Sequence, residues 1–138
     1  MQLTSSLAVE EAEKRSAVAG VVADTLMQSA EDYIHAHLKE SFSLLDLTEA
    51  VGTSPSSLLR AFNTHHGVSP MQYVKRLRLQ AVRRSLSSAD PQTTTVGHVA
   101  VDFGFRQLGR FSAQYRDAFG EFPSVTLRRN RQPGVHEL

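Results

Sequence analysis

Apolar residues recur at steps of three and four along most of the chain, and no stretch alternates apolar and polar residues for long. This periodicity is typical of helices that bury one face, so it predicts an all-α fold. Two helices are predicted near the N-terminus, one capped by Ser5 or Ser6 and one over residues 26–39. The first has an apolar seam, weakened by Gly20, of Leu7, Val18, Val21, Val22 and Leu26; the second has Leu26, Ala30, Tyr33, Ile34, His37 and Leu38.

Capping residues and breaks divide the rest of the chain into shorter helices. Ser43 and Asp46 have the spacing of a capping box, and Ser54-Pro55 places a cap before a proline at the first helical position. The helices predicted in this way are 44–51, ended by Gly52; 55–66, ended by Gly67; 70–88; 96–102, capped by Thr94 or Thr95; 107–119, ended by Gly120; and a last turn from Pro123. Residues from Asn130 to Leu138 are predicted to form a frayed tail.

The helix predicted over 70–88 has two unlike sides. Its apolar seam consists of Met71, Val74, Leu77, Ala81 and Leu86. Its other side is basic and carries Lys75, Arg76, Arg83 and Arg84. One side is therefore expected to face a core and the other to face solvent or a charged partner.

The sequence contains an internal repeat. The first copy has two apolar residues, a glycine and a proline at spacings of four, five and three: Leu58, Phe62, Gly67 and Pro70. The second copy has the same spacings 53 residues later: Phe111, Tyr115, Gly120 and Pro123. Just upstream the shift is 52, from Leu47, Thr48 and Gly52 to Val99, Ala100 and Gly104. One residue is therefore inserted in the second turn.

Each copy has the features of a helix-turn-helix. A small residue, Thr48 or Ala100, lets the two helices approach closely. Gly52 and Gly104 accept the positive φ that ends the first helix. The second helix of such a unit can present its outer face to a DNA major groove. Two copies at matched spacing, joined by a long basic helix, are a stronger signal than either copy alone.

With these motifs the chain resembles the DNA-binding region of the AraC/XylS family of bacterial transcription regulators. The matching segments lie within about residues 26–130 and are SPSSLLRAF, GVSPMQYVKRLRL, VAVDFGFRQLGRFSAQYRDAFG and FPSVTLRR. The resemblance implies an all-α fold with two helix-turn-helix subdomains, at about 44–67 and 96–120, joined by a linker helix at about 70–87. The expected fold has about seven helices plus an N-terminal helix. Residues 1–25 are then an acidic N-terminal helical segment or interdomain linker, and 131–138 a disordered tail.

The resemblance also implies which residues face DNA. On the first recognition helix these are Ser56, Ser57, Leu59, Arg60 and Asn63, and at the second they are Arg106, Gln107, Leu108, Arg110, Ser112 and Gln114. Arg110 is expected to contact guanine, because a guanidinium can bond O6 and N7 together, and Gln107 is expected to read adenine. Arg60 contacts either a guanine or a phosphate. Many family members have polar residues at the positions of Leu59 and Leu108-Gly109. The two leucines can instead make apolar contact with thymine methyl groups.

A linker helix of about 18 residues is about 27 Å long at about 1.5 Å per residue. That length is near the roughly 34 Å of one DNA turn. The two recognition helices are therefore expected to enter successive major grooves on one face of the DNA.

The charge supports a polyanionic partner only when it is followed along the chain. The formal net charge is +1, from 15 Lys and Arg against 14 Asp and Glu, which alone argues against nucleic-acid binding. Residues 1–49, however, hold three basic and nine acidic residues, and residues 50–138 hold twelve basic and five acidic ones. No acid lies between Glu49 and Asp90. The positive part coincides with the repeat, which favours double-stranded DNA as the partner.

Several other classes of function are excluded or disfavoured by composition. The chain has no cysteine, which excludes disulfides, thiolate metal sites and cysteine nucleophiles. Its six histidines lack carboxylates at ligand spacing, so no metal and no cofactor are expected. No nucleophile–base pair or phosphate-binding glycine loop stands out, so no enzyme is expected. No apolar run approaches a membrane span and no secretory signal is present, so a cytoplasmic, nucleoid-associated location without membrane contact is expected.

The resemblance implies further partners, namely RNA polymerase and a sensing or dimerising domain absent from this chain. Family members commonly carry that domain before the DNA-binding region, whereas only about 25 residues precede the match here. Either the chain is a fragment or short variant of a regulator, or its acidic first helix docks on a partner. The alternative to DNA binding is a helical protein-interaction module that has lost it.

Overall fold

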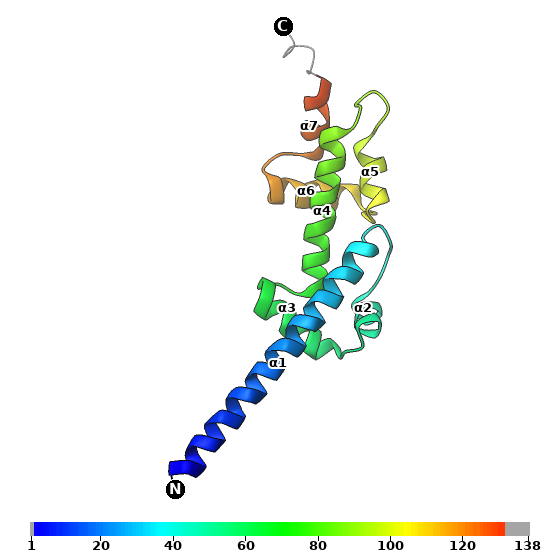
Figure 1. Cartoon of the computed structure of the whole chain (residues 1–138). Coiled ribbons are helices and arrows are strands. Elements are labelled where there is room, and N and C mark those ends of the chain that lie inside the picture. Colours follow the sequence, from blue (N-terminus) through cyan, green and yellow to red (C-terminus); the bar gives the residue numbers. More distant parts are fainter. Residues whose placement is uncertain (1, 132–138) are drawn as a thin grey trace. The chain divides into compact units, whose positions relative to one another are not determined.

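The computed structural model describes the backbone of residues 2–131 and the side chains of residues 8–130 other than 16, 18 and 19. All regular elements in the described residues are helices, which confirms the all-α fold. They are α1 (Gln2–Ala36), α2 (Leu44–Val51), α3 (Pro55–His66), α4 (Pro70–Ser88), α5 (Val96–Asp102), α6 (Leu108–Phe119), α7 (Pro123–Arg128) and the 3₁₀ helix η1 (Arg129–Arg131) (Figure 1). The chain divides into two compact units, Met1–Ala36 with Ser43–Pro70, and His37–Phe42 with Met71–Leu138.

The N-terminal part is one helix where the sequence predicted two. α1 begins at Gln2, so Ser5 and Ser6 lie inside the helix and the predicted cap at one of them is wrong. The helix continues through Gly20 to Ala36. A glycine inside a helix costs only about 1 kcal/mol relative to alanine, which longer-range continuity can offset. The predicted end at residue 39 is also wrong, because residues 37–39 form a turn. Joining these two helices leaves seven α-helices in the described residues.

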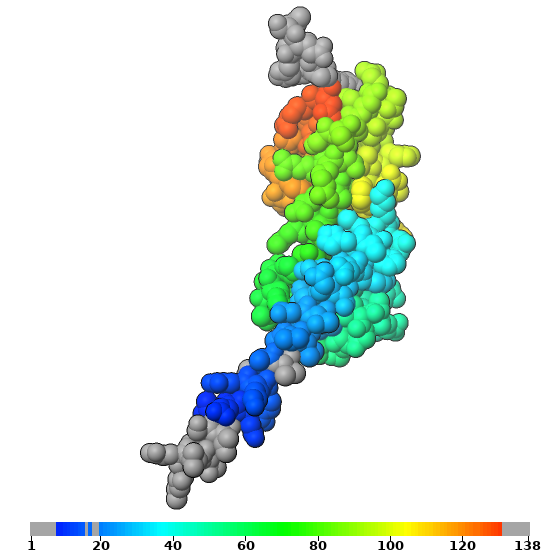
Figure 2. Space-filling view, in the orientation of Figure 1, coloured from blue at the N-terminus to red at the C-terminus, as the bar shows by residue number. Residues whose placement is uncertain are grey.

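The N-terminal half of α1 has no buried face among its described side chains. All of residues 8–15 are exposed, and Figure 2 shows them in dark blue without any part of α2 or α3 over them in that view. The apolar seam predicted for this part is wrong at Val21 and Val22, which are 66% and 61% exposed. The predictions for Leu7 and Val18 lie outside the described side chains.

The first unit packs α2 and α3 against the C-terminal half of α1 (Figure 1). Its buried residues include Met27, Ala30 and Ile34 on α1, Leu47 and Thr48 on α2, and Leu58, Ala61 and Phe62 on α3. The hydroxyl of buried Thr48 donates a hydrogen bond to the carbonyl of Leu45 (2.8 Å), so the small residue at the helix crossing has its polar group satisfied. The Nε2 of His66, at the end of α3, lies 2.7 Å from Oε1 of Glu31 on α1.

The second unit packs α5, α6 and α7 around α4. Its core consists of Leu79, Ala81, Val82, Leu86, Val99, Ala100, Phe103, Phe111, Tyr115 and Leu127. Leu79 and Val82 were missing from the predicted seam of this helix, whereas Met71 and Leu77 of that seam are only half-buried. The basic side of α4 is exposed as predicted.

A polar network closes the end of the second unit. The buried Tyr115 hydroxyl and the Thr126 Oγ1 are 2.8 Å apart, Thr126 donates to Glu121 (2.6 Å), and Arg129 donates to the other oxygen of Glu121 (2.6 Å). The hydrogen bonds from Thr126 and Arg129 hold the pKa of the Glu121 carboxyl below its usual range. Burial raises the pKa of Tyr115.

The end of the described chain is anchored. The Asn130 side chain donates to the carbonyls of Leu86 (2.8 Å) and Ala89 (2.9 Å), so the frayed tail predicted from Asn130 onward does not include Asn130. The prediction for residues 132–138 lies outside the described residues.

The internal repeat is confirmed by matching local geometry. Gly52, Gly67, Gly104 and Gly120 all have φ between 68° and 88°, and all four stand at the predicted ends of helices or turns. In the first turn the Thr53 amide donates to the Thr48 carbonyl, and the Phe105 amide donates to Ala100 in the same way 52 residues later. The caps of the next helices, Ser54 and Gln107, are 53 residues apart. Arg106 is therefore the inserted residue, and Gln107 is the cap of α6, not its first residue.

The repeat also includes the helix before each helix-turn-helix, which the sequence motifs do not indicate. The buried residues Met27, Ala30 and Ile34 of α1 match the buried residues Leu79, Val82 and Leu86 of α4, again at a shift of 52. Each unit thus has a three-helix plan: the C-terminal half of α1 with α2 and α3, and α4 with α5 and α6.

Candidate nucleic-acid interface

The first predicted recognition helix, α3, presents its candidate residues outward. Ser54 caps it, because its Oγ accepts a hydrogen bond from the Ser57 amide (3.2 Å), and Pro55 fixes its first turn. Leu58 and Phe62 are fully buried, which sets the rotation of the helix. The opposite face carries the five predicted residues, all exposed: Ser56, Ser57, Leu59, Arg60 and Asn63.

One side of this face is flanked by α1. A groove of about 490 Å³ runs between the two helices, lined from α1 by Val22, Ala23 and Leu26 and from α3 by Ser57, Arg60, Ala61, Thr64 and His65. The Nε2 of His65 lies 3.7 Å from Oδ1 of Asp24 across the same pair of helices. Of the predicted site residues on α3, Ser57 and Arg60 therefore border α1, whereas Ser56, Leu59 and Asn63 do not line this groove.

The second predicted recognition helix, α6, is fixed in the same way by buried Phe111 and Tyr115. Arg106 and Gln107, which precede it, are exposed, as are Leu108 and Arg110, whereas Ser112 and Gln114 are half-buried. Leu108 also has a packing role: its Cδ1 would lie 3.3 Å from a Cβ at Gly97, so it covers that glycine of α5. An apolar residue at this position is therefore explained by the crossing of α5 and α6.

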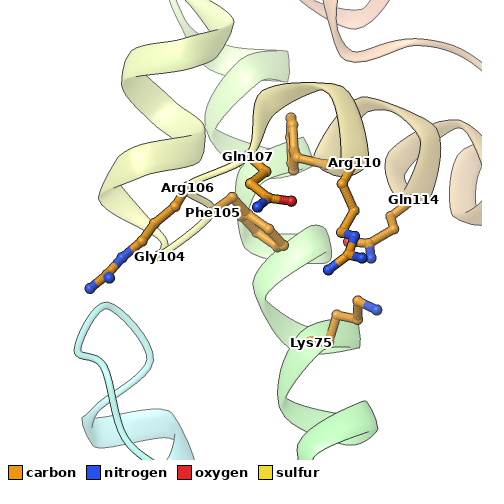
Figure 3. A pocket seen from close by; sticks show the side chains of 8 residues that line it. Lys75, Gly104, Phe105, Arg106, Gln107, Arg110 and Gln114 are labelled. Atoms are coloured by element: carbon orange, nitrogen blue, oxygen red, sulfur yellow. The ribbon is translucent and has the colours of Figure 1, made fainter.

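An open cleft lies between α4 and the start of α6. It has a volume of about 380 Å³, and its lining consists of Lys75, Gly104, Phe105, Arg106, Gln107, Arg110, Phe111 and Gln114. The fold thus gathers four of the predicted site residues with Lys75, which was predicted only as part of the basic side of its helix. Figure 3 shows the side chains of Arg110 and Gln114 extending toward the region above Lys75, while Arg106 points away from them.

None of the residues that line this cleft is acidic. Lys75 and Arg110 are both exposed, and neither has an acidic partner among the described side chains. Like charges in such a setting create a positive potential that attracts anions. The sequence signal that indicates this cleft is the acid-free stretch between Glu49 and Asp90.

Arg78, in the same acid-free stretch, has a structural role instead. Its guanidinium donates to the carbonyls of Leu38 (3.0 Å) and Glu40 (2.6 Å) and lies 5.1 Å from the ring centroid of Phe42. Partial burial lowers the pKa of Arg78, and the two carbonyls supply acceptors for the half-buried cation. Arg78 therefore fixes residues 37–42 to α4.

The described residues offer little support for other kinds of site. They contain no group of three or more histidine, aspartate and glutamate side chains placed to hold a metal ion. None of their helices combines the length and the apolar character that crossing a membrane requires.

Comparison with known proteins gives consistent matches. A family model described as a helix-turn-helix domain matches residues 47–129. The XylDLEGF operon transcriptional activator 2 of Pseudomonas putida is 42% identical over 95 residues, which cover 69% of this chain and 60% of that protein.

Solved structures agree. A probable AraC family transcriptional regulator from Rhodopseudomonas palustris is 41% identical, with a TM-score of 0.68 over 75% of this chain and 95% of that one. The DNA-binding domain of AdpA, solved in complex with a target DNA, is 26% identical, with a TM-score of 0.63 over 80% of this chain and 95% of that one. The chain therefore belongs to the AraC/XylS family of helix-turn-helix transcription regulators.

Proposed function

We propose that this chain binds specific sequences in double-stranded DNA and regulates transcription, with α3 and α6 as its recognition helices. The observation that carries the proposal is the acid-free cleft at the start of α6, which is lined by Arg106, Gln107, Arg110 and Gln114. Charged and amide side chains at the start of a recognition helix are suited to reading base edges in a major groove. Membership of a family of DNA-binding regulators supports the same function.

The residues of α6 have separate roles in this proposal. Arg110 bonds O6 and N7 of a guanine together, and Gln107 reads an adenine. Leu108 covers Gly97 on one side and is 46% exposed on the other, which leaves surface for a thymine methyl group.

On α3, Arg60 is the main polar reader that the exposed face offers. Arg60 contacts either a guanine or a phosphate in this proposal, and the two contacts differ in outcome. A base contact contributes to sequence preference, whereas a phosphate contact strengthens binding to all sequences alike.

The two recognition helices enter successive major grooves in this proposal, so a bound site has two half-motifs roughly 10 base pairs apart. RNA polymerase and a sensing or dimerising domain are proposed as further partners, and the bacterial cytoplasm, at the nucleoid, as the place of action.

Selection of bound sequences from a random duplex pool, followed by binding measurements at several salt concentrations, tests the function. We expect two half-motifs and an affinity that falls steeply with salt, because each phosphate contact releases counterions. Absence of duplex binding even at about 50 mM salt would contradict the proposal and favour a protein-interaction module that has lost DNA binding. Recovery of a single motif would restrict base reading to one unit and leave the other as a clamp.

A further inference from the structure

The two units have equivalent grooves that differ at two matched positions, although Arg60 also lines the groove of the first unit. The groove between α1 and α3 in the first unit corresponds to the cleft between α4 and α6 in the second. With the shifts of 52 and 53 residues established above, Ala23 matches Lys75, and Ser57 matches Arg110. The first unit therefore has an alanine and a serine where the second has two cations.

This difference shows that the fold does not require a lysine at position 75. Both units bury the same three positions on the helix that bears this residue, namely Met27, Ala30 and Ile34 in one and Leu79, Val82 and Leu86 in the other. Because the three-helix plan forms equally with alanine at the equivalent position, packing does not explain Lys75. An exposed lysine that faces a second cation in an acid-free cleft is instead suited to bind an anion.

We infer that the cleft between α4 and α6 binds a phosphate of the DNA backbone, with Lys75 as its anchor. The inference rests on the proposed DNA binding and adds a positioning residue from α4, outside both helix-turn-helix motifs. The ammonium of Lys75 carries three donors and acts as a point charge, and the Gln114 amide beside it offers a further donor. A bound phosphate offsets the charge of Lys75 and thereby leaves the Arg110 guanidinium available for a base.

The test is the salt dependence of binding by Lys75→Gln in the full chain. The probes are the duplex selected from the random pool and a scrambled duplex of equal length, with binding followed by fluorescence anisotropy. We expect Lys75→Gln to lower the affinity for both duplexes by the same factor. The slope of log affinity against log salt should become shallower by about 0.9, the value for one phosphate contact.

Arg76→Gln is the matched control. Arg76 is the next residue of α4, it is exposed and it does not line the cleft, so the substitution removes the same charge from the same helix. We expect the salt slope of Arg76→Gln to match that of the unaltered chain. Circular dichroism of both variants checks that α4 is still folded.

Three outcomes overturn the inference while leaving DNA binding itself intact. They are an unchanged salt slope for Lys75→Gln, an equal loss of slope for Arg76→Gln, and a loss of affinity by Lys75→Gln for the selected duplex alone. The last of these would make Lys75 a base reader. If the unaltered chain binds neither duplex, the proposed function is wrong and this inference is wrong with it.

Discussion

The two three-helix units share a backbone plan but differ in what stabilises them and in what they expose. In the first, histidine–carboxylate pairs join α3 to α1, and the groove beside α3 is lined from α1 by Val22, Ala23 and Leu26. In the second, an aromatic cluster and a buried tyrosine network hold α6, and the equivalent cleft is cationic. Positions that differ between the units without any demand from packing are the ones to examine for function.

The largest expected effect comes from the aromatic residues that both units bury. Phe62→Ala in the first unit and Phe111→Ala in the second should each lower the free energy of unfolding by about 3–5 kcal/mol, because each empties a fully buried site. Urea unfolding measures the loss, and amide hydrogen exchange shows whether it stays within the altered unit. A Phe111→Ala protein of unaltered stability would mean that α6 is rotated from the orientation described.

The next effect compares equivalent residues of α3 and α6, the two proposed recognition helices, in DNA binding. Arg110→Ala should weaken binding to the selected duplex by about 1–3 kcal/mol and relax base preference at one position, because the proposed bidentate guanine contact is lost. Ser57→Ala, at the matching position of α3, should change affinity much less. Anisotropy titrations with selected and scrambled duplexes measure both. Equal weakening of the two duplexes by Arg110→Ala would make Arg110 a phosphate contact.

A smaller effect should come from the hydroxyl network of Tyr115, Thr126 and Glu121 in the second unit. Tyr115→Phe removes one buried hydrogen bond, to Thr126, and should lower the free energy of unfolding by about 1 kcal/mol. The matching residue of the first unit, Phe62, has no hydroxyl, so the substitution makes the two units more alike. Thermal or urea unfolding measures the change. A loss of less than about 0.3 kcal/mol would show that water replaces the bond at little cost.

The same network predicts how stability depends on pH. The pKa of Glu121 is lower in the folded chain than in the unfolded chain. The ionised carboxyl therefore contributes to the free energy of unfolding in full at pH values above the ordinary pKa of a glutamate, and this contribution is lost as the pH falls through the folded-state pKa. Glu121→Gln should therefore flatten the acid side of the stability profile. Urea midpoints measured from near neutral pH to about pH 3 test this, and an unchanged profile would contradict it.

The smallest effect concerns two glycines of the second unit. Nothing lies within 4 Å of a Cβ placed at Gly109, so Gly109→Ala should stabilise the chain by up to about 0.5–1 kcal/mol through helix propensity. Gly97→Ala is the control, because its Cβ would press on Leu108 at 3.3 Å and cancel that gain. Equal stabilisation by both would show that Leu108 moves freely off α5. Thermal unfolding measures the pair.

Most helix ends were predictable from the sequence because they depend on local chemistry. The capping box of Ser43 and Asp46, the Ser54-Pro55 start and the glycines with positive φ each act within a few residues. The N-terminal helices were the exception, because the sequence predicted a first helix capped at Ser5 or Ser6 and a separate second helix over 26–39, whereas one helix runs from Gln2 to Ala36.

The parts that escaped prediction depend on residues far apart in the chain. The groove beside α3 requires α1 to be continuous, and the cleft beside α6 brings Lys75 to Arg110 from 35 residues away. Ala30 matches Val82 and Ala23 matches Lys75, but the residue types differ in both pairs. The fold, not the sequence, therefore reveals that α1 and α4 belong to the repeat.

The continuity of α1 has a consequence in terms of helical phase. Each residue of an α-helix adds about 1.5 Å of length and about 100° of rotation. Deletion of one residue between Ala8 and Arg15 would leave α2, α3 and the groove beside them untouched, yet turn everything before the deletion by roughly a quarter of a circle. A partner held by the start of α1 would then meet α3 from a different side, whereas deletion of four residues would leave the facing only about 40° from the original.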